Sequence, residues 1–184
     1  MKVIAIAAVT AGGKTTVVNE LVKKLPRAKS LHFDDYSFDG EVEDFGAWVK
    51  DGADYNVWDL SPLKKDILAI MESSECDYLV LDYPFAYCNS ELSEYIDCAI
   101  FIDTPLDIAM ARRILRDMQN ASGDEIRDEL DIYIRFARDA YVVMLEKVRP
   151  SSDYIIDGTM ELDEKIQEIM KIILEGVMRC ASDR

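Results

Sequence analysis

The fold is decided by residues 2–16, which read KVIAIAAVTAGGKTT. Residues 2–8 form a continuous apolar run, the pattern of a parallel strand that is covered on both faces. Residues 8–16 have the spacing of a phosphate-binding P-loop, with Ala8 where the first glycine of the motif usually stands. The alternative is a glycine turn with a chance lysine. A strand before the motif and a helical pattern after it favour the P-loop.

The chemistry of this loop predicts binding of a nucleoside triphosphate, with ATP and Mg²⁺ as the expected pair. Backbone N–H groups must converge on the β-phosphate, and Gly13 lets the chain pass close to it, while the following helix offers its positive N-terminus. Lys14 is expected to reach the β- and γ-phosphate oxygens, and the Thr15 hydroxyl to bind Mg²⁺. The predicted nucleotide-binding residues of the loop are Thr10, Ala11, Gly12, Gly13, Lys14, Thr15 and Thr16.

The rest of the chain alternates short apolar runs with helical patterns. Strands are expected at residues 30–33, 78–82, 99–103 and 154–156. Helices are expected at residues 15–25 and 162–177. Two more are expected after the cap Ser61-Pro62, with Leu63, Ile67, Leu68 and Met71 on one face, and after Thr104-Pro105. A further helix is expected from the capping box of Ser122 and Glu125 to about Val148. This alternation predicts a three-layer α/β/α sandwich with a parallel sheet, as in P-loop nucleoside triphosphate hydrolases. The length of 184 residues fits a single domain, residues 1–184.

Two aspartates are expected at the carboxyl ends of strands, where parallel sheets collect their chemistry. Asp34 follows the second strand, and Asp82 ends the third in the form of a Walker B acid. A carboxylate beside the phosphate loop can take a proton from an attacking hydroxyl or hold a Mg²⁺ water. The predicted metal ligands are therefore Thr15, Asp34 and Asp82. The alternative for each aspartate is a turn or helix cap, which we favour for Asp35 and Asp103.

A local group of arginines, Arg112, Arg113 and Arg116, stands out in an acidic chain. Arg112 and Arg116 are one helical turn apart, and planar guanidinium groups suit the oxygens of a transferring phosphate. The alternative is a solvated face paired with Asp107, Asp117 or Asp124.

The overall charge of −15 argues against a protein that wraps DNA or RNA, because phosphate backbones need a basic surface. The cysteines, at positions 76, 88, 98 and 180, form no C-x-x-C pair, and His32 is the one histidine. These features predict free thiols in a reducing cytoplasm and no zinc site. The apolar start is too short for a membrane span, so we expect neither a membrane nor a nucleic-acid partner. The oligomeric state is left open.

With these parts placed, the sequence resembles the uridine kinase and nicotinamide riboside kinase group of P-loop small-molecule kinases. The resemblance covers most of the chain, through residues 3–16, 31–36, 56–62, 79–85, 100–104, 112–117 and 154–159. It implies that Asp34 is the general base on a sugar hydroxyl and that Lys14, Arg112, Arg113 and Arg116 complete the catalytic set. It also implies a helical lid at about residues 112–130, a loop beside the adenine at Gly158 and Thr159, and a substrate-side loop at residues 56–62.

The implied function is transfer of the γ-phosphate of ATP to a small-molecule acceptor, with a nucleoside or riboside first. The predicted substrate-binding residues are Asp34, Tyr36, Asn56, Trp58, Asp59 and Tyr83; of these, Tyr36, Trp58 and Tyr83, like Tyr55, suit stacking on a flat base or packing in the core. The sequence departs from the group at residues 120–124, NASGD, where uridine kinases usually carry a glycine-arginine-aspartate segment.

Three other functions share parts of this pattern. A GTPase switch needs N-K-x-D and D-x-x-G motifs, which the sequence lacks. A nucleoside monophosphate or other metabolite kinase shares the core, although a second arginine cluster for an acceptor phosphate is not obvious. A nucleotide-binding module that has lost catalysis is disfavoured by the joint presence of Lys14, Thr15, Asp34 and Asp82. The tripeptide at residues 44–46, DFG, stands without the H-R-D motif of a protein kinase.

Overall fold

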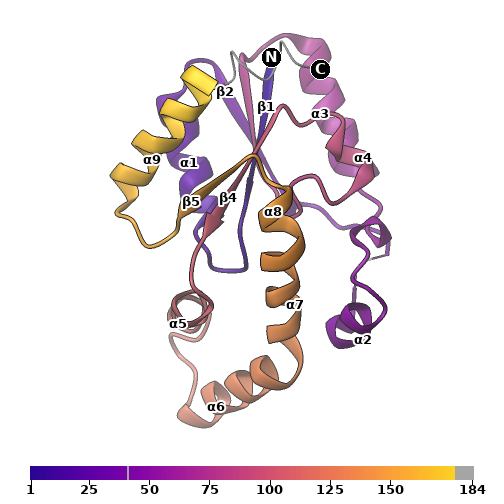
Figure 1. Cartoon of the computed structure of the whole chain (residues 1–184), viewed down its shortest axis with the longest axis vertical. Coiled ribbons are helices and arrows are strands. Elements are labelled where there is room, and N and C mark those ends of the chain that lie inside the picture. The colour runs from indigo at the N-terminus through magenta and orange to yellow at the C-terminus, as the bar shows by residue number, and fades with distance from the viewer. Residues whose placement is uncertain (41, 177–184) are drawn as a thin grey trace.

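A five-stranded parallel sheet forms the centre of the molecule (Figure 1). The computed structural model describes residues 1–40 and 42–176. Its strands are β1 (Lys2–Ala7), β2 (Ala28–His32), β3 (Tyr78–Asp82), β4 (Cys98–Asp103) and β5 (Tyr154–Asp157), in the spatial order β2-β3-β1-β4-β5. The strand that carries the P-loop is therefore the middle one, and the carboxyl ends of all five strands meet at one edge.

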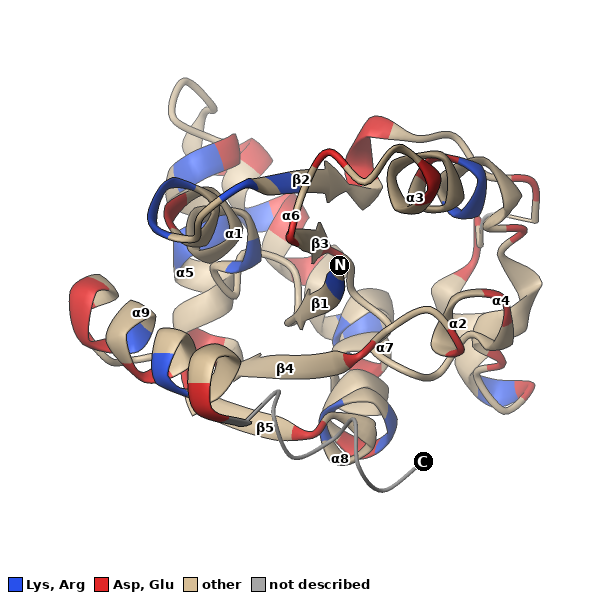
Figure 2. Ribbon diagram, turned by 90° about the horizontal axis from the view of Figure 1, so that it is seen from above, with Lys and Arg blue, Asp and Glu red and all other residues tan. Residues whose placement is uncertain are grey.

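Helices cover both faces of the sheet. They are α1 (Lys14–Lys24), α2 (Phe45–Lys50), α3 (Ser61–Ser73), α4 (Ser90–Ser93), α5 (Leu106–Asp117), α6 (Gly123–Ile132), α7 (Arg138–Val143), α8 (Arg149–Ser151) and α9 (Leu162–Lys171). Helices α1 and α9 lie on one face, and α3 and α4 lie on the other with α7 and α8 (Figures 1 and 2). This arrangement confirms the predicted α/β/α sandwich. Helices α5 and α6 lie beyond the carboxyl ends of the strands, in the lower part of Figure 1.

The side chains of β1 show why the sheet is buried on both faces. Ile4 and Ile6 pack with α1 and α9, while Val3, Ala5 and Ala7 pack with α3 and α7. Because successive side chains of a strand point to opposite faces, only a strand that is apolar at every position can serve two cores at once. The continuous apolar run of the sequence is therefore the direct cause of the central place of β1.

Several helix starts differ from the sequence prediction. Ser61 is not an N-cap: α3 begins at Ser61 itself, and its backbone N–H donates to Asp59 Oδ1 over 2.9 Å. Thr104 does not cap α5 either, because that helix begins at Leu106 with Pro105 at the N-cap position. Although hydroxyl residues are preferred as N-caps, Ser61 and Thr104 each bond to another partner and do not cap these helices.

Other boundaries shift by a few residues. Strand β2 ends at His32, and Phe33–Asp35 form a 3₁₀ turn instead of continuing it. Met71 is 40% exposed, not on the buried face of α3, and Ile70 packs against the core instead. The capping box of Ser122 and Glu125 is confirmed. The helical run behind it reaches Ser151 and contains two π-helical segments, Tyr133–Ala137 and Met144–Val148.

At the C-terminal end, α9 continues as a π-helical segment, Ile172–Gly176. Val177 of the predicted helix, and Cys180, lie outside the described residues. Of the other three cysteines, Cys76 and Cys98 are buried and Cys88 is half-buried, and none of these three forms a disulfide bond among the described residues. Within residues 1–40 and 42–176, no helix is both long enough and apolar enough to span a bilayer.

The loops after β1, β4 and β5 are joined by one buried hydroxyl. Thr104 Oγ1, fully buried, donates to the carbonyl oxygen of Gly12 in the P-loop over 2.9 Å. Gly158, behind β5, packs so closely on Thr104 that a Cβ atom there would lie 1.9 Å from Thr104 Oγ1. Glycine is thus required at position 158, because any side chain would push Thr104 off the P-loop.

We predict that Gly158→Ala lowers the free energy of unfolding by about 1–3 kcal/mol, because the added methyl group overpacks this junction. The measurement is chemical denaturation. An unchanged slope of the unfolding free energy against denaturant concentration checks that unfolding stays two-state. Gly123→Ala is the matched control, since the nearest atoms to its Cβ are 3.8 Å away on the flexible side chain of Arg127. Equal stability of Gly158→Ala and wild type would contradict the close contact.

Candidate active site

A cavity of about 1280 Å³ runs along the carboxyl edge of the sheet. The P-loop contributes to its middle, with Thr10, Ala11, Gly13, Lys14, Thr15 and Thr16 in the lining. On the β2 and β3 side the lining includes Asp34, Pro84 and several aromatic rings, and on the β5 side it includes Thr159, Met160 and Lys165. Arginines of α5 and residues of α7 complete the wall. The volume exceeds that of most single-ligand pockets, so the cavity has room for two ligands side by side.

The P-loop has the backbone that phosphate binding requires. Gly13 stands immediately before α1 with a φ of 100°, in the left-handed region that side chains disfavour. Beyond the neighbouring backbone, no atom of residues 1–40 and 42–176 lies within 4 Å of a Cβ at this position, so the backbone conformation, not crowding, calls for glycine. No side chain caps the backbone N–H groups at the start of α1, and this end of the helix lines the cavity. This is an anion site of the helix N-terminus type.

Asp82 is the electrostatic centre of the site. Its Oδ2 accepts a hydrogen bond from Thr15 Oγ1 over 2.5 Å, and its Oδ1 lies 3.4 Å from Lys14 Nζ. His32 Nδ1 lies 3.3 Å from the same Oδ2. The carboxylate is only 5% exposed, and Oδ1 has no hydrogen-bond partner among the described residues. Apart from the contact with Lys14, this nearly buried oxygen has no partner among the described residues, which indicates a partner that arrives with a ligand.

The Thr15 hydroxyl and the Asp82 carboxylate fit a Mg²⁺ site of the kind found with nucleotides. Mg²⁺ takes oxygen ligands, and it commonly uses one or two protein groups together with phosphate oxygens and waters. No group of three or more His, Cys, Asp and Glu side chains able to hold a metal ion occurs in the part of the chain that the structure describes. A site that needs nucleotide oxygens to be complete is consistent with that finding.

Asp34 lines the cavity from the 3₁₀ turn behind β2 and is exposed to it. Across the cavity, Arg116 is held by two hydrogen bonds to Asp117, of 2.6 and 2.9 Å. The pKa of Arg116 is raised, first by those bonds and then by the charges of Asp117 and Asp34. The carboxylate of Asp34 and the guanidinium group of Arg116 are therefore close enough to interact electrostatically, and both line the cavity.

The three arginines of α5 differ in their partners. Arg113 pairs with Glu129 of α6 over 2.6 Å and donates to the Tyr141 hydroxyl over 3.2 Å, so it ties three helices together. Arg116 pairs with Asp117, as the solvated-face alternative foresaw. Arg112 forms no ion pair among the described residues; its Nη2 lies 3.5 Å from the carbonyl oxygen of Gly158. Arg112 is thus the arginine with the most donors left for a ligand.

The β2 and β3 side of the cavity is lined with aromatic rings. Trp48, Tyr55, Trp58 and Phe85 form a cluster in which the centroids of contacting rings are 4.8–6.2 Å apart. Phe33, Phe45, Val42 and Met144 extend this apolar wall. A wall of this kind suits a flat, weakly polar group, and Asp34 belongs to the same lining.

Four of the predicted substrate contacts lie outside the cavity lining. Tyr36 donates to Asp66 over 2.8 Å, and Asp59 holds the start of α3. Asn56 Oδ1 accepts from the backbone and hydroxyl of Ser90, both over 2.8 Å, and Tyr83 is buried in the core. Trp58 does line the cavity. Gly158 and Gly12 are absent from the lining, but they position the loops around it through Thr104.

Sequence reasoning missed other residues of the wall, among them Phe45, Trp48, Tyr141, Met144 and Lys165. Most lie on helices α2 and α7, whose apolar positions look like ordinary core positions in the sequence. Lys165 has a detectable signal: it occupies a position on the apolar face of α9 and is 5% exposed beside Ile166 and Ile169.

Comparisons with known proteins identify the family of this chain. Residues 68–163 match the Phosphoribulokinase / Uridine kinase family. The chain belongs to this family. The match includes Asp82, the arginines of α5 and the loop of Gly158. The resemblance to uridine kinases is thereby confirmed.

The sequence identity between this chain and two of its relatives is low. A chloroplastic uridine/cytidine kinase of Arabidopsis thaliana is 24% identical over 197 aligned residues, which cover 91% of this chain and 41% of that protein. A uridine kinase of Borrelia hermsii is 25% identical over 178 residues, covering 85% of this chain and 86% of the relative. The chain thus spans less than half the length of the plant relative.

Solved structures show the same fold. A shikimate kinase from Bacteroides thetaiotaomicron superposes with a TM-score of 0.55 at 15% identity, covering 94% of this chain and 98% of that one. A putative fructose transport system kinase from Silicibacter gives a TM-score of 0.57 at 14% identity, covering 84% and 88%. At such identities the likeness concerns the fold, which is that of P-loop kinases.

We predict that Asp82→Asn removes the Mg²⁺ dependence of nucleotide binding while the protein stays folded. The amide oxygen can still accept from Thr15, but the charge that would hold the cation is gone. Isothermal titration calorimetry with ATP, once with Mg²⁺ and once with EDTA, measures the gain in ATP affinity due to the metal. Asp103→Asn is the matched control, because Asp103 ends the neighbouring strand β4 but pairs with Arg149 over 2.9 Å. An unchanged gain in Asp82→Asn would contradict the assignment.

Proposed function

We propose that the protein transfers the γ-phosphate of ATP to a hydroxyl of a small molecule, with a nucleoside or riboside as the first candidate. The observation that carries this proposal is the arrangement of one cavity around Lys14 and Asp34. The phosphate loop lies in the middle, an aromatic wall with a carboxylate at its edge lies on the β2 and β3 side, and a separate loop lies on the β5 side. Residues 1–184 would act as one kinase domain, with a lid at about 112–130.

In this proposal the P-loop amides and Lys14 hold the triphosphate, and Thr15 and Asp82 hold Mg²⁺. The bound Mg²⁺ supplies charge that offsets the negative phosphate oxygens. On binding, Lys14 would turn to the phosphates and Asp82 to the cation, so the present contact between Lys14 and Asp82 would be given up.

Asp34 would orient the acceptor hydroxyl and take its proton as the oxygen attacks the γ-phosphorus. The carboxylate is exposed to the cavity and forms no ion pair in the described residues, so it is free to accept that hydrogen bond. Arg112 and Arg116 would neutralise the charge that develops on the transferring group, while Arg113 holds α5, α6 and α7 together as one unit. Closure of that unit would exclude water.

The aromatic wall supports a nucleoside or another flat acceptor over a simple sugar. Rings stack on a base at little entropic cost, whereas a polyol in the same place would leave hydroxyl groups without partners. A panel of nucleosides, nicotinamide riboside, pantothenate and simple sugars, assayed by ADP release, tests this choice. If ATP binds and no acceptor stimulates turnover, the protein is a nucleotide-binding module and the proposal fails.

We predict that Asp34→Asn lowers turnover of the best acceptor by about 10²- to 10⁴-fold, the usual contribution of a general base. Acceptor binding should stay close to that of wild type. The fluorescence of Trp48 and Trp58 reports it directly, since these are the two tryptophans of the chain and both line the cavity.

Asp35→Asn is the matched control, because Asp35 is the adjacent carboxylate, is exposed and does not line the cavity. It should retain turnover within a factor of about two, as expected for a surface substitution. Near-normal turnover in Asp34→Asn, or an equal loss in both variants, would remove Asp34 as the base.

A further inference from the structure

His32 is a polar side chain at the carboxyl edge of the sheet that the proposed reaction does not use. It ends β2, it is the one histidine of the sequence, and its side chain is 23% exposed. The parallel register places it opposite Asp82 on β3. Because residues that stand opposite each other on neighbouring strands point to the same face of the sheet, the imidazole ring lies beside the carboxylate that is proposed to hold Mg²⁺.

The ring of His32 is held between two oxygens. Its Nδ1 lies 3.3 Å from Asp82 Oδ2, and its Nε2 lies 3.1 Å from Ser30 Oγ. An ionised carboxylate can only accept a hydrogen bond, so the proton that faces Asp82 is on Nδ1. A hydroxyl can donate, so Ser30 donates to Nε2 of the uncharged ring. Ser30 stands two residues before His32 on the same strand, and it therefore fixes the ring from the same face of the sheet.

The bond from His32 determines which oxygen of Asp82 is left free. Thr15 Oγ1 donates to Oδ2 over 2.5 Å, and His32 Nδ1 donates to the same oxygen. A carboxylate oxygen has two lone pairs, so these two donors occupy both lone pairs of Oδ2. Oδ1 has no hydrogen bond among the described residues and faces Lys14 Nζ. The two donors thus fix the rotation of the carboxylate and leave Oδ1 for a cation.

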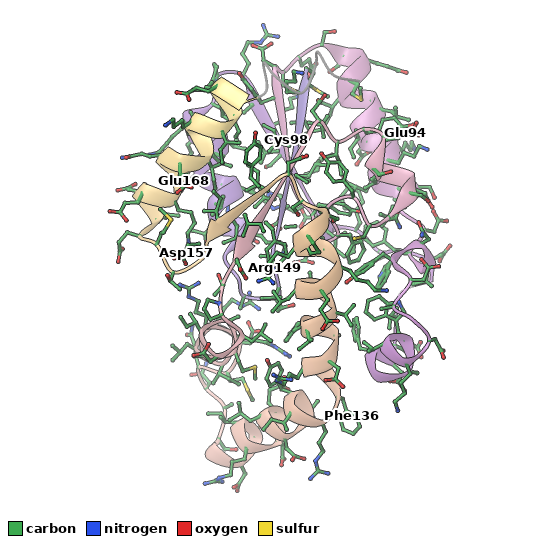
Figure 3. All side chains as sticks on the ribbon, in the orientation of Figure 1. Glu94, Cys98, Phe136, Arg149, Asp157 and Glu168 are labelled. Carbon is green, nitrogen blue, oxygen red and sulfur yellow. The ribbon has the colours of Figure 1, made fainter. Side chains whose placement is uncertain are left out.

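The carboxylate that ends β4 is oriented in a different way. Strands β3 and β4 flank β1, and Asp103 at the end of β4 accepts from Arg149 Nη1 over 2.9 Å. Figure 3 labels Arg149, which reaches from α8 to the end of β4. A guanidinium group is always charged, so it offsets the charge of the carboxylate that it orients. An uncharged imidazole orients Asp82 and leaves its negative charge available to Mg²⁺.

The orientation of Asp82 matters because Mg²⁺ tolerates little distortion. This ion demands nearly octahedral geometry and short bonds to oxygen, so a carboxylate that rotates freely is a poor ligand. Groups that hydrogen-bond to metal ligands orient them, and their loss typically costs about 10- to 100-fold in metal affinity. Among the described residues, only Thr15 and His32 donate to Oδ2, and Thr15 is itself a proposed Mg²⁺ ligand. His32 is therefore the donor to this oxygen that does not bind the cation.

We propose that His32 is a positioning residue for Mg²⁺. Its Nδ1–H group, fixed by Ser30, holds the Asp82 carboxylate with Oδ1 turned toward the cation. His32 does not line the cavity, so it acts through Asp82 and not on a ligand. The inference rests on the proposed Mg²⁺ site of Thr15 and Asp82, and it adds the residue that sets the geometry of that site.

The test is isothermal titration calorimetry of the full chain with ATP, once with Mg²⁺ and once with EDTA. His32→Leu removes the donor and should lower the gain in ATP affinity due to Mg²⁺ by about tenfold, the lower end of the usual effect of such a partner. ATP affinity in EDTA should equal that of wild type. His32→Asn keeps an N–H donor near the position of Nδ1 and should restore most of the gain.

Arg149→Met is the matched control, because it removes the donor to the carboxylate that ends the other strand beside β1. It should leave the gain due to Mg²⁺ unchanged. A full gain in His32→Leu, an equal loss in His32→Asn, or a loss that persists in EDTA would overturn the proposal. If wild type binds ATP without any gain from Mg²⁺, the proposed metal site is wrong and the inference falls with it. If wild type does not bind ATP, the proposed nucleotide site itself is wrong.

Discussion

The contact between Asp82 and the phosphate loop is the interaction on which the rest of the site depends. A nearly buried carboxylate at the end of β3 holds the Thr15 hydroxyl and faces the Lys14 ammonium group. It can do so because β3 lies directly beside β1, with Ile6 opposite Asp82 in the parallel register. Strand pairing therefore sets the distance between Asp82 and Thr15, the two residues proposed to hold Mg²⁺, and His32, opposite Asp82 on β2, extends the same row.

A second junction organises the other side of the sheet. Thr104 joins the P-loop to the loop of Gly158, and that loop carries the carbonyl shared by Arg112 and Lys165. Since each of these loops follows a different strand, the register of β1, β4 and β5 is transmitted to the cations around the cavity. The P-loop is thus supported by Asp82 on one side and Thr104 on the other, and Ala8 is not among the residues with a positive φ, so alanine fits there without backbone strain.

The sequence predicted the fold because its signals were local and strong. The apolar run of β1 and the capping box at Ser122 are each defined by neighbouring residues, and both agree with the structure. Ser61 and Thr104 were misassigned as caps because a hydroxyl has several possible partners, and the choice of Gly12 for Thr104 is made by a contact 92 residues away. Propensity cannot report such a contact.

The two halves of the site were predictable to different degrees. The P-loop and Asp82 are recognisable since a motif fixes their spacing, whereas the aromatic wall is assembled from α2, the segment that follows it and the loops after β2 and β3. The local pattern does not distinguish Trp48 from a core residue. It also does not show that the exposed Asn56 bonds to Ser90 and not to a substrate. The positions of side chains that meet only in three dimensions must come from the structure.

The central claim is that the loop at residues 8–15 binds the phosphates of a nucleoside triphosphate through Lys14. It is tested most directly by isothermal titration of MgATP into wild type, Lys14→Ala and, as a control, Lys24→Ala at the far end of α1. The account predicts that Lys14→Ala lowers ATP affinity by about tenfold or more, as expected when a charged contact to phosphate is lost, while Lys24→Ala binds like wild type. A folded Lys14→Ala protein with unchanged ATP affinity would contradict it.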